Sequence, residues 1–390
     1  MTTVLDRPSP SPAPAQPAER DHRGSWIPTG AMITTRIMEL RKRRGLMIAL
    51  VVVNIGIPSV FLIVRLLSHA IAPKSYGPAG GYDIYTNMVA GVMYVFGFIV
   101  AATLGATAGS IDLTEGMFRH LVVTGRSRMA LYLARIPAGL AIVWTILAVG
   151  FTIVCAVCVF AAPTSVNYDG ATLPAGLSLT GFENWAGAHP RTAICAMPYQ
   201  GDNTVVGSVQ CGPNGPVGPG VSVKGSPAPT SATPPTPAAL KAAAIDVAKQ
   251  NYAGYRALFL YPSTSLMIRS GLWLGLEATI GFIVGLGLGS LIGQRTVTVI
   301  LMIVLEVILT PILSTHVIPH LLNAQRAVVG LATGHLEPAG LPLVFGGGGG
   351  QGPGAMRLLP ESRTVAVCVV VAWLVGWTAL GAWRMVTRDA

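Results

Sequence analysis

Two glutamates stand in long apolar stretches of the sequence, where a charged side chain is costly. Glu277 interrupts one stretch, and in the next Glu306 begins a polar stripe that continues through Thr310 at helical spacing. A charge at the centre of a bilayer is so unfavourable that both carboxylates should face protein, water or a partner charge. Two interpretations stay open: Glu277, Glu306 and Thr310 line a polar translocation path or its gate, or the glutamates form a protonated or hydrogen-bonded pair that packs two helices together.

Glycine recurs every four residues shortly after Glu277. Gly281, Gly285 and Gly289 therefore lie on one face of a helix. Glycine is costly inside a helix, but in a bilayer it allows the backbone of another helix to approach closely. This face is predicted to be a helix-packing surface.

Other residue patterns that could do chemistry are incomplete in this sequence. His316 and His320 are four apart, but the Glu of a His-Glu-x-x-His zinc site is missing. Cys155 and Cys158 lie in an apolar stretch, where cysteine acts as a small apolar residue. None of the five lysines follows a glycine, so the sequence contains no Gly-x-x-x-x-Gly-Lys phosphate loop. We therefore expect no catalytic residue, metal site or cofactor on this chain, and no nucleotide hydrolysis by the chain alone.

The composition indicates that membrane helices position these residues. Of 390 residues, 52% are hydrophobic and only 11% are charged, against about 25% charged in soluble domains, which excludes a disordered chain and an ordinary soluble enzyme. In a membrane protein, the location of the basic residues indicates orientation, so the net charge of +10 does not predict a nucleic-acid partner, and none is expected. The predicted fold is an all-α polytopic membrane protein with six transmembrane helices, each of about 20 residues or more, at 46–68, 86–109, 130–161, 270–293, 296–318 and 364–385.

The residues before the first span predict its orientation. Residues 1–30 are rich in Pro, Ala and Ser and predict a disordered tail. Residues 31–45 carry an amphipathic stripe that suits a helix lying in the membrane interface; a frayed extension of the first span is the alternative. The basic run 41–44 should hold the N-terminus in the cytosol. With six spans, both termini are cytosolic in this multi-pass protein of the cell membrane.

The polar segment 110–128, between spans two and three, has the pattern of a short cytosolic helix. Asp112 and Glu115 have the spacing of an N-capping box, and Gly125 supplies a C-terminal stop. Such a helix would expose Phe118 and Leu121, which suits docking into a groove on another protein. The alternative is a connecting turn with a cap.

Two segments are expected outside the membrane on the opposite side. Residues 163–265 form a large external segment rich in Gly and Pro, whose only cysteines, Cys195 and Cys211, predict a disulfide in an oxidising compartment. Residues 319–363 contain a run of five glycines and are expected to be flexible there. The membrane parts of the chain are 46–162, 266–318 and 364–390, the last ending in a cytosolic tail.

This layout resembles the membrane-spanning permease subunits of ABC transporters of the exporter class, which move drugs, lipids and polysaccharides. The resemblance covers the chain from about residue 32 onward, apart from the long external insertion. It rests on the order of elements: an interfacial helix, two spans, a cytosolic helix, four spans, and an external element between spans five and six. It also rests on the family's motif at the entry to span three. Met117 replaces the family's Thr and Gly125 its Pro, whereas the matching residues are Glu115, Gly116, Leu121, Thr124, Ser127 and Arg128.

The resemblance implies partners and a mechanism. The helix after span two would dock on a separate ATP-binding cassette ATPase, which would hold the ATP and magnesium. A second permease copy, identical or different, would complete a dimer in the lipid bilayer, with the substrate path along the dimer interface. The implied coupling residues are Asp112, Glu115, Gly116, Phe118, Leu121, Arg126 and Arg128.

Two rival functions stay open on the sequence. One is a membrane-anchored sensor or scaffold whose external segment binds a ligand. The other is an ion-coupled secondary transporter that uses Glu277 and Glu306.

Overall fold

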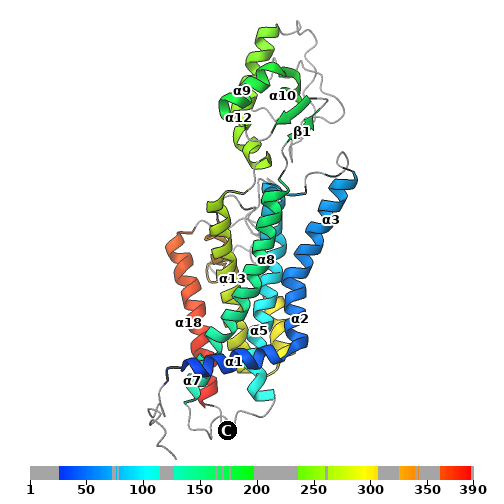
Figure 1. Cartoon of the computed structure of the whole chain (residues 1–390). Helices are drawn as coiled ribbons and strands as arrows, with labels where there is room; N and C mark the ends of the chain where they lie inside the picture. Colours follow the sequence, from blue (N-terminus) through cyan, green and yellow to red (C-terminus); the bar gives the residue numbers. More distant parts are fainter. Residues whose placement is uncertain are drawn as a thin grey trace, which may run out of the picture.

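The computed structural model is a helical membrane bundle with a small folded unit at one end (Figure 1). Five helices are long and apolar enough to cross a membrane, which confirms the predicted helical membrane class at the level of five spans. The structure describes residues 26–72, 76, 79–114, 127–162, 165–168, 171–174, 177–196, 236–259, 262–305, 325–338, 341 and 361–387.

The first two spans are each interrupted by a π-helical turn. Span one runs through α2 (Arg44–Val51), the π-turn η1 (Val52–Gly56) and α3 (Ile57–Ile71). Pro58 explains η1, because proline lacks the N–H that would bond to the carbonyl of Asn54 four residues earlier. Span two runs through α4 (Tyr82–Asn87), η2 (Met88–Met93) and α5 (Tyr94–Thr114).

The remaining spans are more regular helices. Span three joins α7 (Arg128–Leu133) to α8 (Arg135–Phe160) through a turn at Ala134. The next span, α13 (Thr264–Ile292), begins at an N-cap in which Ser263 Oγ accepts from Leu266 N, and it ends at Gly293 with a left-handed φ of 75°. The last is α18 (Arg363–Thr387).

Helices α5 and α13 form the centre of the bundle. In the most apolar window of each span, 67% of the residues of span two and 72% of those of α13 are buried, against 22% for span one and for α18. The peripheral helices therefore expose apolar side chains outward, as is expected of a surface that faces lipid.

The fifth predicted span, 296–318, is described only in its first part. Helix α14 (Arg295–Ile303) starts just after α13 ends, whereas residues 306–318 lie outside the described residues. Helix α13 ends and α18 begins at opposite ends of the bundle (Figure 1). The connection 293–362 therefore links opposite ends of the bundle.

A short buried helix lies within the segment 319–363, before α18. The five glycines at which flexibility was expected lie outside the described residues. Helix α17 (Val329–Gly334) is buried at every residue, and its Val329 and Ala332 pack in a cluster with residues of α5, α13 and α18.

The external segment contains a folded unit that stands beyond the bundle (Figure 1). It contains the antiparallel pair β1 (Ser165–Tyr168) and β2 (Ala171–Pro174), with Ser165 opposite Pro174. It also contains α9 (Leu179–Ala188), α10 (Pro190–Ala196) and α12 (Pro237–Phe259), of which α9 and α10 pack on α12. We call these five elements the external subdomain.

Helix α1 (Gly30–Lys42) lies across the opposite end of the bundle, near α7 and the end of α18 (Figure 1). We call this the α1 end of the bundle. The position agrees with an amphipathic helix parallel to a membrane surface.

Candidate functional site

A partly buried ion pair lies within α1, where this helix packs on the bundle. Arg36 Nη1 lies 2.7 Å from Glu39 Oε2, and the Arg36 side chain is only 9% exposed. Arg36 and Leu40 are the buried residues of α1, which packs on α8. A charge so poorly solvated is tolerated only when it is paired, and Glu39 provides that pairing within α1.

The second basic residue at this junction is Arg135, at the start of α8. It is 2% exposed, and its Nη1 donates to the carbonyl of Gly109 in α5 at 3.3 Å. The hydroxyl of Ser290 in α13 also reaches the Gly109 carbonyl, at 3.5 Å. Arg36, Glu39 and Arg135 lie around one small cavity. We call Arg36, Glu39, Arg135, Gly109 and Ser290 the α1 junction, which joins α1, α5, α8 and α13.

Arg135 was not among the site residues predicted from the sequence. Its signal was nevertheless present: an arginine inside the apolar stretch 130–161 must find a polar partner. The partner is a backbone carbonyl of another helix, and no sequence pattern reports that.

The predicted coupling segment lies partly outside the described residues. Asp112 lies in the last turn of α5, which continues to Thr114, and not at the N-cap of a separate helix. The capping-box spacing is local, whereas the burial of Ile111 beside the α1 junction favours continuation of α5. Glu115, Gly116, Phe118, Leu121 and Arg126 lie outside the described residues.

Ser127 and Arg128, at the end of the coupling segment, have clear structural roles. Ser127 Oγ accepts from Ala130 N at 3.1 Å and caps α7. Arg128 Nη1 donates to the carbonyl of Val386 at 3.1 Å, where a cation is favoured by the C-terminal end of α18. Arg128, at the end of the coupling segment, therefore links the start of α7 to the end of α18.

The glycine face of α13 lies against α5. An ideal Cβ on Gly285 would lie 2.5 Å from the carbonyl oxygen of Ala102, and one on Gly289 would lie 2.6 Å from that of Ala106. At Gly281 the nearest atoms belong to Phe98. Gly105 and Gly109 of α5 approach the backbone of α13 in the same way. Since glycines alternate across the interface, the two backbones are in contact over several turns.

Glu277 is buried within the bundle, at 2% exposure. It lies one turn after Trp273, which stacks on Tyr94 of α5 with ring centroids 5.3 Å apart. This burial satisfies the requirement that an intramembrane carboxylate face protein. Glu306 and Thr310, the other residues of the predicted path or gate, lie outside the described residues.

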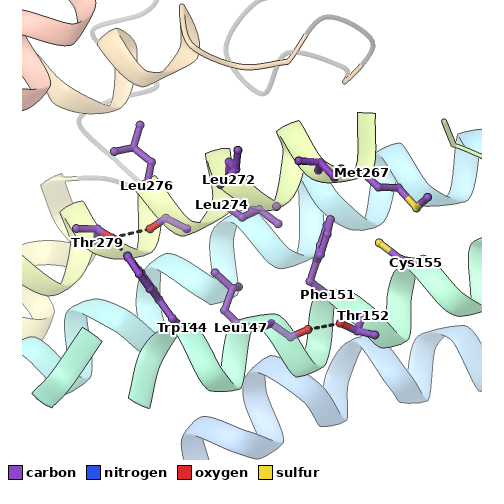
Figure 2. A pocket seen from close by; sticks show the side chains of 14 residues that line it. Trp144, Leu147, Phe151, Thr152, Cys155, Met267, Leu272, Leu274, Leu276 and Thr279 are labelled. Carbon is purple, nitrogen blue, oxygen red and sulfur yellow. Dashed lines mark hydrogen bonds between the residues drawn. The ribbon is translucent and has the colours of Figure 1, made fainter. Parts of the chain in front are cut away.

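A groove with a volume of ≈ 790 Å³ lies between α8 and α13. Figure 2 shows Trp144, Leu147 and Phe151 of α8 facing Met267 and Leu274 of α13. Polar atoms in the groove are satisfied within the protein: Trp144 Nε1 donates to Thr279 Oγ1 at 3.1 Å, and Thr279 Oγ1 donates to the carbonyl of Gly275 at 2.7 Å. The groove therefore offers an almost purely apolar surface.

Two tryptophans hold the α17 segment inside the bundle. Trp273 Nε1 donates to the carbonyl of Thr333 at 3.2 Å, and Trp373 Nε1 donates to that of Ala327 at 2.8 Å. Trp273 and Trp373 lie roughly 14 and 15 Å below the starts of α13 and α18 by the helical rise. The segment thus re-enters the bundle, where the indole N–H of Trp273 satisfies a buried backbone carbonyl.

The external subdomain has its own core. Phe182 stacks on Tyr255 with ring centroids 4.1 Å apart, and Leu177 N donates to the Tyr255 hydroxyl at 2.9 Å. Burial raises the pKa of Tyr255, while the hydrogen bond from Leu177 opposes this shift and the neighbouring Tyr252 adds to it.

Cys195 in the external subdomain is disulfide-bonded. Cys211, its predicted partner, lies outside the described residues. The chain has five cysteines, and the other three, Cys155, Cys158 and Cys368, are free thiols. Cys211 is therefore the one intramolecular partner left for Cys195.

The described site consists mainly of helix–helix contacts and apolar surface. Within the described ranges, no group of three His, Cys, Asp or Glu side chains is placed to hold a metal ion. What the geometry offers is a rigid α5–α13 core, a polar junction at one end, a re-entrant segment at the other and an apolar groove between. In comparisons with protein-family models, curated proteins and solved structures, no match to this chain was found.

Proposed function

We propose that this chain is the permease subunit of an ATP-driven ABC exporter and forms the transmembrane path for its substrate. The proposal rests mainly on the position at which the coupling segment joins the bundle. Its two ends, Thr114 of α5 and Ser127 before α7, meet the helices at the α1 end of the bundle. In this proposal the α1 end faces the cytosol of a cell whose plasma membrane holds the protein.

The contacts at both ends of the segment support a coupling role. On one side α5 is locked to α13 by the glycine contacts and to α8 by Arg135. On the other side Arg128 reaches the end of α18. A displacement of residues 115–126 by a partner would therefore move α5 and α13 as one unit and would also reach α18. Rigid elements of this kind can carry energetic coupling between distant sites.

The partner in this proposal is a separate ATP-binding cassette ATPase, which binds ATP and magnesium. This chain contains no phosphate loop, so the energy must come from another subunit. A second permease, identical or different, would complete the dimer, and the translocation path would run along the interface between the two. Closure of the ATPases would switch the permease pair between inward- and outward-facing states.

Purification from native membranes tests the class of protein. The full chain is solubilised in mild detergent, captured through a tag on its C-terminus and analysed for bound proteins. An ATP-binding cassette subunit should co-purify in near-equal amount. Its consistent absence, with the chain intact, would favour a sensor or scaffold. Substrate transport that depends on a proton gradient and survives ATP depletion would favour the ion-coupled secondary transporter.

A further inference from the structure

A second cavity lies at the end of the bundle opposite α1. It has a volume of ≈ 460 Å³ and lies between α13, the start of α18 and the residues that follow α17. This volume falls within the range of about 300–1,000 Å³ that is usual for small-molecule sites. Its lining includes Arg269, Leu272, Trp273, Leu276, Glu337 and Arg363. We call it the distal pocket.

Two arginines give the distal pocket its charge. Arg269 and Arg363 are both exposed, although they are distant in sequence and come from different helices. In the described part of the chain, neither makes an ion pair. Glu337 is the carboxylate of the same pocket and is 9% exposed. The lining therefore keeps one net positive charge, which favours an occupant with one net negative charge.

The apolar side of the distal pocket is shared with the groove between α8 and α13. Leu272 and Leu276 line both cavities, and in Figure 2 both side chains point away from α8. Gly275 lies between these leucines in the sequence and has no side chain to raise the surface of α13 there. At Gly275 an added Cβ would meet no atom within 4 Å. An extended chain can therefore pass from the pocket over α13 into the groove.

The groove has the length and chemistry of an acyl-chain site. Its lining residues on α13 run from Met267 to Thr279, which is roughly 18 Å along the helix and more than half of the about 30 Å hydrocarbon core. Arg269 lies near the end of its span, at the depth where lipid headgroups lie. Basic pockets between transmembrane helices bind anionic headgroups, and guanidinium groups suit phosphate oxygens.

We infer that the distal pocket and the groove together bind a phospholipid with a net negative headgroup. Its phosphate lies between Arg269 and Arg363, and one acyl chain crosses Leu272 and Leu276 into the groove between α8 and α13. The lipid is a resident ligand that bridges α13, α18 and the α17 segment. This inference does not depend on the exporter proposal, because a bound lipid would serve any membrane protein with this bundle.

Photo-labelling in nanodiscs tests the inference on the full chain. The protein is placed in phosphatidylcholine nanodiscs that contain a trace of phosphatidylglycerol with a photoactivatable acyl chain, or of phosphatidylcholine with the same chain. Peptides of α8 and α13 are then analysed by mass spectrometry. Phosphatidylglycerol should label the groove several times more strongly than phosphatidylcholine, and soluble glycerol phosphate should not compete. Equal labelling by the two lipids would overturn the inference, and full competition by glycerol phosphate would assign the pocket to a soluble phosphate instead.

Matched variants separate the headgroup site from the chain site. Arg269→Gln or Arg363→Gln should each reduce labelling by phosphatidylglycerol about fivefold, as expected for a partly exposed charge-assisted contact. Arg295→Gln, at the other end of α13, is the control and should change nothing. Gly275→Leu should fill the groove and lower labelling, whereas Gly376→Leu in α18, where a Cβ also meets no atom within 4 Å, should not.

Each variant is first compared with the unchanged protein by thermal unfolding, so that a folding defect is recognised. Because Arg269 and Arg363 are exposed and Gly275 faces open space, we expect all of these variants to fold. Labelling that survives both arginine changes in folded protein refutes the headgroup assignment. Co-purification of an ATPase is unaffected by these outcomes, so failure here leaves the exporter proposal intact.

Discussion

Replacement of Gly285 by alanine tests the idea that α5 and α13 behave as one rigid unit. The new Cβ would lie 2.5 Å from the carbonyl oxygen of Ala102, about 0.9 Å short of ordinary contact, which begins at 3.4 Å. The obstacle is a backbone atom in the middle of a helix and cannot rotate away. The two helices would have to separate, which would also loosen the contacts at Gly281 and Gly289.

The size of the effect follows from two opposing terms. Overpacking of a filled interface costs about 1–3 kcal/mol, whereas replacing glycine by alanine inside a helix otherwise gains up to about 1 kcal/mol. Gly275→Ala in the same helix should have only the gain in helix stability, without overpacking, because its Cβ meets no atom within 4 Å. Gly285→Ala should therefore be less stable than Gly275→Ala by about 1–3 kcal/mol. In the double variant, Gly289→Ala should destabilise the protein less than it does alone, because Gly285→Ala has already separated the two helices.

Unfolding of the purified chain in mixed micelles, with increasing dodecyl sulfate, measures this difference. Both variants are prepared in the same detergent and followed by circular dichroism. If Gly285→Ala proves as stable as Gly275→Ala, the backbone contact between α5 and α13 is not tight, and the argument for a rigid unit fails.

Three further predictions concern the α1 junction, α18 and the external subdomain. Arg135→Gln weakens the donation to the Gly109 carbonyl and should cost about 1.5–3 kcal/mol, seen as faster hydrogen exchange in α1 and at the end of α5; unchanged exchange would contradict it. Gly381→Ala places a Cβ against the Tyr132 hydroxyl and should lower the melting temperature, and Tyr132→Phe in the same chain should restore part of the loss. Burial raises the pKa of Tyr255 above its ordinary 10.0, so the folded subdomain keeps a proton that the unfolded chain releases, and its stability should fall as pH rises above 10.0. Tyr255→Phe should flatten that fall in an alkaline titration followed by limited proteolysis, and an unchanged slope would refute the assignment.

Features with a helical period could be predicted from the sequence. Apolar stretches near 20 residues identified the spans that the structure describes, because only helices cross a membrane with every backbone group satisfied. The amphipathic stripe placed a helix before the first span, and α1 occupies Gly30–Lys42. The fourfold spacing of Gly281, Gly285 and Gly289 indicated one packing face, and these residues lie against α5.

Features that join distant parts of the chain could not be predicted in this way. Arg269 and Arg363 are distant in the sequence, and only the fold brings both to one pocket. The burial of α17 could not be predicted from its sequence, because it depends on packing against residues of α5, α13 and α18. Asp112 was misplaced by a local capping pattern, since packing at the α1 junction extends α5 past it.

The central claim is that residues 110–128 couple this permease to a separate ATPase, and ATP hydrolysis in reconstituted liposomes tests it most directly. The chain is combined with an ATP-binding cassette subunit that co-purifies with it, and hydrolysis is compared with that of the subunit alone. Glu115→Gln and Phe118→Ala should abolish the stimulation while membrane insertion stays normal, and Lys249→Gln in the external subdomain, the control, should retain it. Full stimulation by Glu115→Gln and Phe118→Ala would contradict the claim.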